Sequence, residues 1–410
     1  MTLPQQQVTS VRWNAVFPWL ILARAVRVAL MLRVIVLALL GVAATHGGWL
    51  LIGSSPLGDR ALRELEVEPQ SWTYSPRPLD MQAGSGASTV VVEANWTYGP
   101  LCSAWRWIVQ PFEKLIQARD WRAWWTLGFA GLWTLAVWAL FGGAIARIAG
   151  VYLTYGETLG PVAALRSSAR KWLSTAGAPL LVALAIAFLA LPLVLTGLLL
   201  RFDLMALLLG LAWIVALIGG AAVAILAVGL AIGWPLMFST VAVERTDAFD
   251  AISRGFAYVY QRPLHLLFYF IVASLLGLLA QAAVDLAATA TTSATEYAVS
   301  IGAGPGRLND LGADGNGVSA GVGDVGAIGS TAIQFWTNVV RAAAAYFPLA
   351  YLWPASTAIY LLLRRGIDAT EMTEVAFDEG EPKVGLPRLA PDAATGVPQV
   401  ERPVDPVTSA

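Results

Sequence analysis

One apolar block, Leu204–Val243, constrains this chain more than any other feature of its sequence. As a single helix its roughly 40 residues would be about 60 Å long, twice the hydrocarbon thickness of a bilayer. The rest of the chain fits a membrane setting, because 57% of its 410 residues are hydrophobic and only 13% are charged. Soluble domains carry about 25% charged residues. The sequence therefore predicts an all-α integral membrane protein.

Six segments reach the roughly 20 apolar residues that a helix needs to cross a bilayer. We predict transmembrane helices at 26–44, 124–146, 178–200, 204–233, 264–284 and 342–363. The long apolar block could instead hold two spans. A single tilted span, with Trp234–Pro235 bending the chain onto the membrane surface, keeps the basic clusters of the chain on one side. Basic residues in short loops mark the cytoplasmic side. We therefore predict a multi-pass protein of the bacterial inner membrane with both termini in the cytoplasm.

This topology divides the chain into a cytoplasmic N-terminal segment, a six-helix transmembrane domain and a cytoplasmic tail, at 1–25, 26–365 and 366–410. The tail is acidic and then Pro-rich, so we expect it to be disordered. Two long extracytoplasmic loops are predicted at 46–120 and 285–340. In the first loop the β-branched run Ser88–Trp96 favours a strand. The second loop is Gly-rich between 302 and 330, which favours disorder.

The segment AFDAISRGFAYVYQRP, residues 248–263, interrupts the apolar chain with a mixed, aromatic-rich pattern. Its larger apolar residues recur every three or four positions, which places them on one face of a helix. These residues are Phe249, Ile252, Phe256 and Val259. Asp247 suits the N-cap of this helix, and Pro263 suits the first turn of the next one. The pattern predicts a short amphipathic helix between two membrane spans.

Two further segments precede spans in the same way, PVAALRSSARKWLSTAGAP at 161–179 and Phe17–Arg27. We therefore predict three units, each an amphipathic cytoplasmic helix followed by a transmembrane hairpin; the alternative is a chance periodicity in a Leu- and Ala-rich chain. Such helices would lie at the membrane interface and bind anionic lipid, each cation contributing about 1 kcal/mol. The predicted contact residues are Arg166, Arg170, Lys171, Phe249, Arg254, Phe256 and Arg262. The other interpretation is that these helices pack under the bundle and seal it, and both can hold together.

At these residues the chain also resembles known proteins. The run AFDAISRGFAYVYQRP, the closing STAIYLLLRRGIDATEMTEV at 356–375 and the six-span layout resemble a family of planctomycete-type bacterial membrane proteins of uncharacterised function. More distantly, the helix-then-hairpin unit is similar to the membrane domain of some bacterial glycerophosphodiester phosphodiesterases. The soluble barrel of those enzymes is absent from this chain. The resemblance therefore implies a membrane fold and no catalytic residues.

Few side chains are available for catalysis or metal binding. The single cysteine, Cys102, excludes an intrachain disulfide, and the histidines His46 and His265 are far apart in the sequence. Arg147, Glu244 and Asp285 fall at the ends of predicted spans, and no predicted span has an acid near its middle. The formal net charge of −1 does not favour a nucleic-acid partner. We therefore expect neither cofactor nor metal.

Three functions remain to be compared. We favour a non-enzymatic protein that organises lipid or a partner membrane protein through its interfacial helices. A permease for a small solute or lipid is the alternative, suggested by Pro192, Pro348 and Pro354 within the spans. A lipid-modifying enzyme would need acidic or histidine residues gathered at an interface, and the sequence does not place such residues near one another.

Overall fold

In a computed structural model of the protein, the described residues are 17–54, 87–304, 306–307, 311, 323–368, 375–376, 389–391 and 398–400. Of these, 87–98, 324, 389–391 and 398–400 are described for the backbone alone. The predicted N-terminal segment 1–25 is described from residue 17 on.

Six helical segments are long and apolar enough to cross a membrane, which confirms the predicted number. Five of them are single helices: α3 (Leu32–Gly53), α6 (Trp121–Tyr155), α8 (Trp172–Leu199), α10 (Trp213–Glu244) and α12 (Pro263–Ala303). The last comprises α14 (Asp324–Ala345) and α15 (Phe347–Ile367), which follow each other closely. The long apolar block forms the short helix α9 (Asp203–Leu211) and then α10, so it contributes one candidate span. Where a bend was predicted, α10 continues through Pro235 as one helix.

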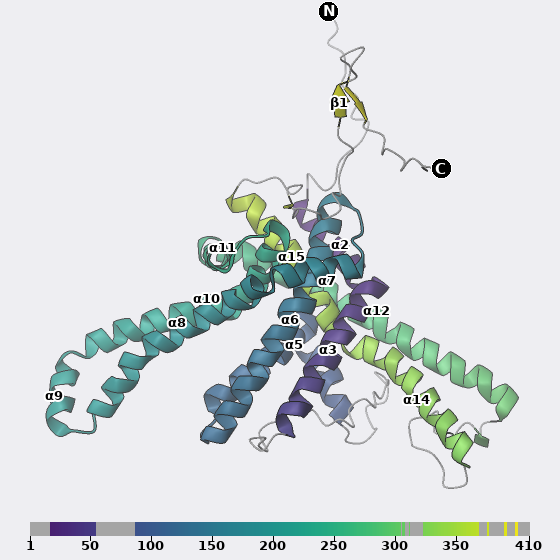
Figure 1. Cartoon of the computed structure of the whole chain (residues 1–410), viewed down its shortest axis with the longest axis horizontal. Coiled ribbons are helices and arrows are strands. Elements are labelled where there is room, and N and C mark those ends of the chain that lie inside the picture. The colour runs from purple at the N-terminus through teal and green to yellow at the C-terminus, as the bar shows by residue number, and fades with distance from the viewer. Residues whose placement is uncertain are drawn as a thin grey trace, which may run out of the picture.

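The helices form an inner group and an outer group. The inner helices α6, α10 and α15 pack against one another at the centre. Outside them, α3 packs on α6, α8 packs on α10, and α12 packs on α15. The hairpin of α8 and α10 and the hairpin of α12 and α14 diverge from this centre as two arms (Figure 1). One indole from each inner helix meets in the core: Trp353 stacks on Trp138 and meets Trp234 edge-on, with ring centroids 5.8 Å apart in both pairs.

Three short helices gather at one end of the bundle, α2 (Ile21–Ala29, preceded by the turn η1, Pro18–Leu20), α7 (Pro161–Arg170) and α11 (Ala248–Gln261). Figure 1 shows them where the central helices converge. α11 has the predicted ends: the Asp247 carboxylate accepts a hydrogen bond from the backbone N–H of Asp250 at 2.9 Å, and Pro263 is the first residue of α12. Both local predictions are confirmed, because capping depends only on neighbouring residues.

The first predicted loop, 46–120, is largely helical where it is described. α3 continues to Gly53, and α5 (Ala87–Gln117) occupies the second half of the loop, with a break in helical geometry at Gly99. The strand predicted at Ser88–Trp96 is therefore wrong. β-branched residues favour strands, but a lone strand leaves its backbone groups unpaired, whereas a helix satisfies them internally. Residues 55–86 of this loop lie outside the described part.

The second predicted loop, 285–340, also departs from expectation. α12 continues to Ala303 and α14 begins at Asp324, so only part of the Gly-rich stretch lies outside the described residues. The extension follows the Ala-rich run after residue 286, because alanine has the highest helix propensity. Asp285, expected at the end of a span, consequently lies in the interior of α12 and is only 4% exposed.

The described parts of the predicted tail, 366–410, are ordered against the bundle or against each other. Val375 is buried, and the backbone N–H of Ala376 donates to the carbonyl of Val243 at 3.1 Å. Further on, β1 (Leu389–Pro391) and β2 (Pro398–Val400) form a short antiparallel pair. The start of the tail is thus attached at the end of α10.

Candidate functional site

The carboxylate of Glu244 joins three helices at the end of the bundle where the short helices lie. Glu244 is the last residue of α10, and its side chain is only 10% exposed. It pairs with Arg254 of α11 at 2.7 Å and with Arg364 of α15 at 3.0 Å. The hydroxyl of Tyr360, also from α15, donates to the same carboxylate. One acid therefore receives two guanidinium groups and a phenol.

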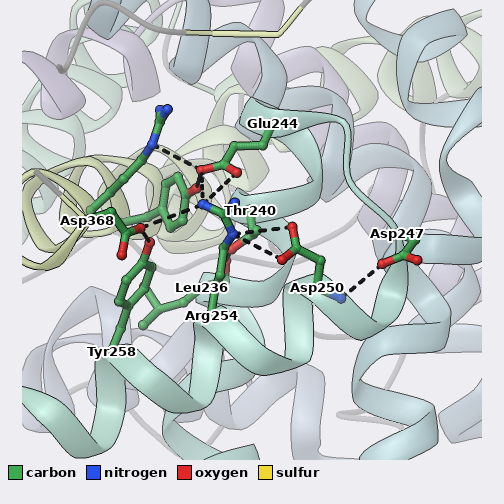
Figure 2. Close-up of polar contacts among 10 residues, drawn as sticks. Leu236, Thr240, Glu244, Asp247, Asp250, Arg254, Tyr258 and Asp368 are labelled. Carbon is green, nitrogen blue, oxygen red and sulfur yellow. Dashed lines mark hydrogen bonds and ion pairs between the residues drawn. The ribbon is translucent and has the colours of Figure 1, made fainter. Parts of the chain in front are cut away.

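Arg254 extends this set of contacts along α11. Asp250, Arg254 and Tyr258 are spaced four residues apart, so they share one face of the helix. Arg254 pairs with Asp250 at 3.2 Å and with Asp368 at 3.6 Å, and the Tyr258 hydroxyl donates to Asp368 at 2.6 Å. Figure 2 shows Arg254 between these carboxylates, with Asp247 capping the same helix. We call this set the Glu244 cluster; its members are Glu244, Asp250, Arg254, Tyr258, Tyr360, Arg364 and Asp368.

The protonation states of Arg254 and Tyr258, both on α11, suit a structural role for the cluster. Burial lowers the pKa of the Arg254 guanidinium, but its interactions with Glu244, Tyr360 and Asp250 more than offset burial and raise the pKa overall. Burial raises the pKa of the Tyr258 hydroxyl, and the hydrogen bond to Asp368 raises it further. Arg254 therefore stays charged and Tyr258 stays a hydrogen-bond donor at neutral pH. The cluster presents fixed donors to fixed carboxylates.

The structure separates the predicted basic contact residues into two kinds. Arg254 belongs to the Glu244 cluster and is committed to protein carboxylates. Arg166 and Arg170 of α7 and Arg262, at the junction of α11 and α12, are exposed, and Lys171 at the end of α7 is half-buried. Among the described residues, no ion pair or hydrogen bond engages the charged group of any of these four. They remain available to a ligand at this end of the molecule.

The two predicted aromatic contact residues also differ. Phe249 is 72% exposed, as expected of a side chain that faces outward. Phe256 instead packs on α10, where a Cβ at Gly229 would lie 2.4 Å from its ring. The buried face of α11 consists of Ala251, Gly255, Tyr258 and Val259, so it is rotated from the predicted stripe. The small residues set this rotation, because they let α11 approach α10 closely.

The sequence alone did not predict most of the Glu244 cluster. Glu244 was recognised only as a charge at the end of a span, and Tyr258, Tyr360, Arg364 and Asp368 were assigned no partner. A usable signal was present: the apolar helices α10 and α15 end with opposite charges in their last turns, Glu244 and Arg364. Spans that end on opposite charges can pair wherever their ends meet.

Metal binding at this site finds no support in the described part of the chain. Among the described residues, no group of three or more His, Cys, Asp or Glu side chains is placed to hold a metal ion. Comparisons with known proteins found no similarity to report: no family model, no curated protein and no solved structure matches this chain.

Proposed function

We propose that this chain is a non-enzymatic protein of the bacterial inner membrane that gathers anionic lipid, or a partner membrane protein, on its cytoplasmic surface. The supporting observation is that α2, α7 and α11 lie at one end of the bundle (Figure 1), where Arg166, Arg170 and Arg262 are exposed. Exposed cations beside amphipathic helices attract anionic headgroups. By the positive-inside rule, the same cations support a cytoplasmic location for this end.

The packing pattern supports three repeated units. α7 packs across α6 and α11 packs across α10, each short helix lying on the inner helix that precedes it in the chain. α2, which has no preceding span, packs on α15, the last inner helix, so the pattern closes into a ring. The sequence of two inner helices agrees: Trp234–Pro235 precedes Arg245 at the same spacing as Trp353–Pro354 precedes Arg364. Each unit is then a short helix followed by a hairpin.

The Glu244 cluster fits this role because it holds α11 against the ends of α10 and α15. Its three carboxylates, from Glu244, Asp250 and Asp368, each contact Arg254. Carboxylates engaged in this way are poor general bases, which favours a structural role over catalysis. In this proposal α11 has both roles that its sequence suggests. Its inner face seals the bundle, and its exposed Phe249 faces outward, toward the membrane interface.

Reporter fusions test the topology. A fusion after Gly302, at the far end of α12, should report the periplasm, and a fusion after Asp368 should report the cytoplasm. A cytoplasmic signal after Gly302 would refute both the orientation and the cytoplasmic placement of the short helices.

Lipid retention tests the function. The variant Arg166→Gln/Arg170→Gln/Lys171→Gln removes the α7 cations, and Arg119→Gln/Arg122→Gln/Arg201→Gln removes three cations at the opposite ends of α6 and α8. After exchange into vesicles of equal phosphatidylglycerol and phosphatidylcholine, the lipid retained on purified protein is quantified. About 1 kcal/mol per cation predicts a loss of phosphatidylglycerol preference on the order of fivefold for each residue removed from α7. Equal losses in both variants would refute a dedicated surface.

A permease remains the second candidate because of one observation. Asp285 is buried inside α12, and an ionisable residue within a membrane helix often marks a solute path. Purified protein in liposomes distinguishes the two functions. Saturable flux of a solute would replace the lipid-gathering proposal with the permease.

A further inference from the structure

The first turns of α6 carry an exposed face that is rich in tryptophan. Trp121, Trp124 and Trp125 are 60%, 57% and 54% exposed. Phe129 and Trp133 continue this face along the helix, at 51% and 41%, because residues four apart lie on the same side of a helix. The face lies at the end of α6 opposite the end from which the chain enters α7. An exposed aromatic patch of this kind marks an interaction surface.

The indole N–H groups of this face are of two kinds. Trp133 Nε1 donates to the carbonyl of Ala44 in α3 at 2.9 Å, so its N–H is satisfied within the protein. Among the described residues, no hydrogen bond engages the indole N–H of Trp121, Trp124 or Trp125. An N–H without an acceptor is strongly unfavourable in hydrocarbon, whereas lipid carbonyls, phosphates and water supply acceptors in the headgroup layer. Trp133 is about 12 Å further along α6 than Trp125 and suits the hydrocarbon, whereas the three earlier indoles suit its boundary.

The distance from this face to α7 is close to the thickness of a membrane. The Ser168 hydroxyl of α7 donates to the carbonyls of Ala139 and Leu140 at 3.1 and 2.8 Å, which fixes the level at which α7 crosses α6. Trp121 and Trp125 lie about 28 and 22 Å before Leu140 along the helix axis. A bilayer core is roughly 30 Å thick and adapts to a mismatch of a few Å at modest cost. With α7 at the cytoplasmic interface, as proposed above, the first turn of α6 therefore reaches the opposite interface.

We infer that Trp121, Trp124 and Trp125 form an anchor that binds the phospholipid headgroup layer of the extracytoplasmic leaflet. Indole rings have an apolar body and a polar N–H, so they partition to this boundary. The contact does not require the neighbouring cations Arg119 and Arg122, because neutral rings carry it. A water-soluble partner would need the rings to project beyond the membrane, and their separation from α7 favours a position at its boundary. The anchor lies in the leaflet opposite the proposed cytoplasmic surface, and only its depth relative to α7 rests on that proposed function.

Spin-label depth measurements test the anchor in the full-length protein in phosphatidylcholine vesicles. Cys102→Ser gives a cysteine-free background, and Arg122→Cys or Leu132→Cys adds one labelled cysteine at an exposed position of α6. Collisions with oxygen report hydrocarbon, and collisions with a nickel chelate report water. The label at 122 should show the balance of a headgroup layer, and the label at 132, about 15 Å further along, that of hydrocarbon. A label at 122 that behaves as in bulk water, or as in hydrocarbon, would overturn the anchor. Val162→Cys on α7 reports the other interface separately, so the two proposals can fail independently.

Fluorescence quenching gives a second measurement on a protein without labels. Trp121→Phe/Trp124→Phe/Trp125→Phe keeps three aromatic rings, and the fluorescence that it loses relative to the wild-type protein belongs to the anchor. Brominated lipids quench indoles at the depth of the bromine atoms. Bromine near the headgroup should quench the lost component more strongly than bromine near the chain ends. Trp133→Phe is the matched control on the same helix, and its lost component should show the reverse order because Trp133 is about 12 Å deeper. The same order in both variants would contradict the anchor.

Discussion

Removing the charge of Glu244 should destabilise the protein far more than removing the charge of Arg254. The Glu244 and Arg364 side chains are 10% and 8% exposed and lie 3.0 Å apart. Breaking a buried ion pair from one side costs about 3–5 kcal/mol, because the remaining charge stays buried without its partner. Glu244→Gln preserves the size of the side chain, so its effect isolates the charge. We expect it to lower the free energy of unfolding by about 3–5 kcal/mol.

Arg254→Gln should cost about 1 kcal/mol or less. The Arg254 side chain is 32% exposed, and solvent screens the attraction of exposed pairs. After its removal, Glu244 still pairs with Arg364 and accepts the hydrogen bond of Tyr360. The two variants should therefore differ by roughly 2–4 kcal/mol, although both remove a member of the same ion pair.

The measurement is a titration of the purified protein from mixed micelles with sodium dodecyl sulfate. Tryptophan fluorescence reports unfolding, since the chain has 17 tryptophans. Asp203→Asn, which removes an exposed acid at the start of α9, serves as the control and should leave the unfolding curve unchanged. Equal losses for Glu244→Gln and Arg254→Gln would show that burial does not set the strength of these pairs. A loss below about 1 kcal/mol for Glu244→Gln would mean that water reaches the cluster.

Three further results are expected. Gly142→Ala should lower stability by about 1–3 kcal/mol through overpacking, because its Cβ would lie 2.5 Å from an indole ring of α15. Gly128→Ala on the same helix, with open space around it, should stabilise the protein by up to about 1 kcal/mol. Equal melting temperatures for the two variants would contradict this packing. Phe256→Ala should lower the free energy of unfolding by about 3 kcal/mol or more. Phe249→Ala, at an exposed position, should leave unfolding in detergent nearly unchanged. Similar losses of stability in the two variants would refute the orientation of α11. The pKa of Tyr258 is raised in the folded protein, so its stabilising contribution is complete below the unfolded value of about 10 and is lost as the pH rises through the folded value. Unfolding free energies measured between pH 8 and 11 should therefore fall less in Tyr258→Phe than in the wild-type protein, and parallel curves would exclude this linkage.

The sequence was sufficient for features that depend on neighbouring residues. The six apolar segments emerged from composition and length, since a bilayer requires a helix of a set length. The ends of α11 followed from Asp247 and Pro263, whose effects on the backbone extend over one turn. Amphipathic periodicity identified α11 as a helix, but it did not identify the buried face. Gly255 and Ala251 decided that face, because small residues gain burial through close approach and not through their own hydrophobicity.

Only the tertiary structure decided which charges meet. Glu244 lies at the end of one apolar helix and Arg364 at the end of another, and each alone resembles an ordinary charge at a membrane boundary. Asp285 likewise resembled a boundary residue until α12 was found to continue beyond it. Local patterns determine whether a segment is helical and apolar, because those properties depend on residues within a few turns. The partner of a buried charge depends on how distant helices pack, and the cost of burying that charge is set by the whole assembly around it.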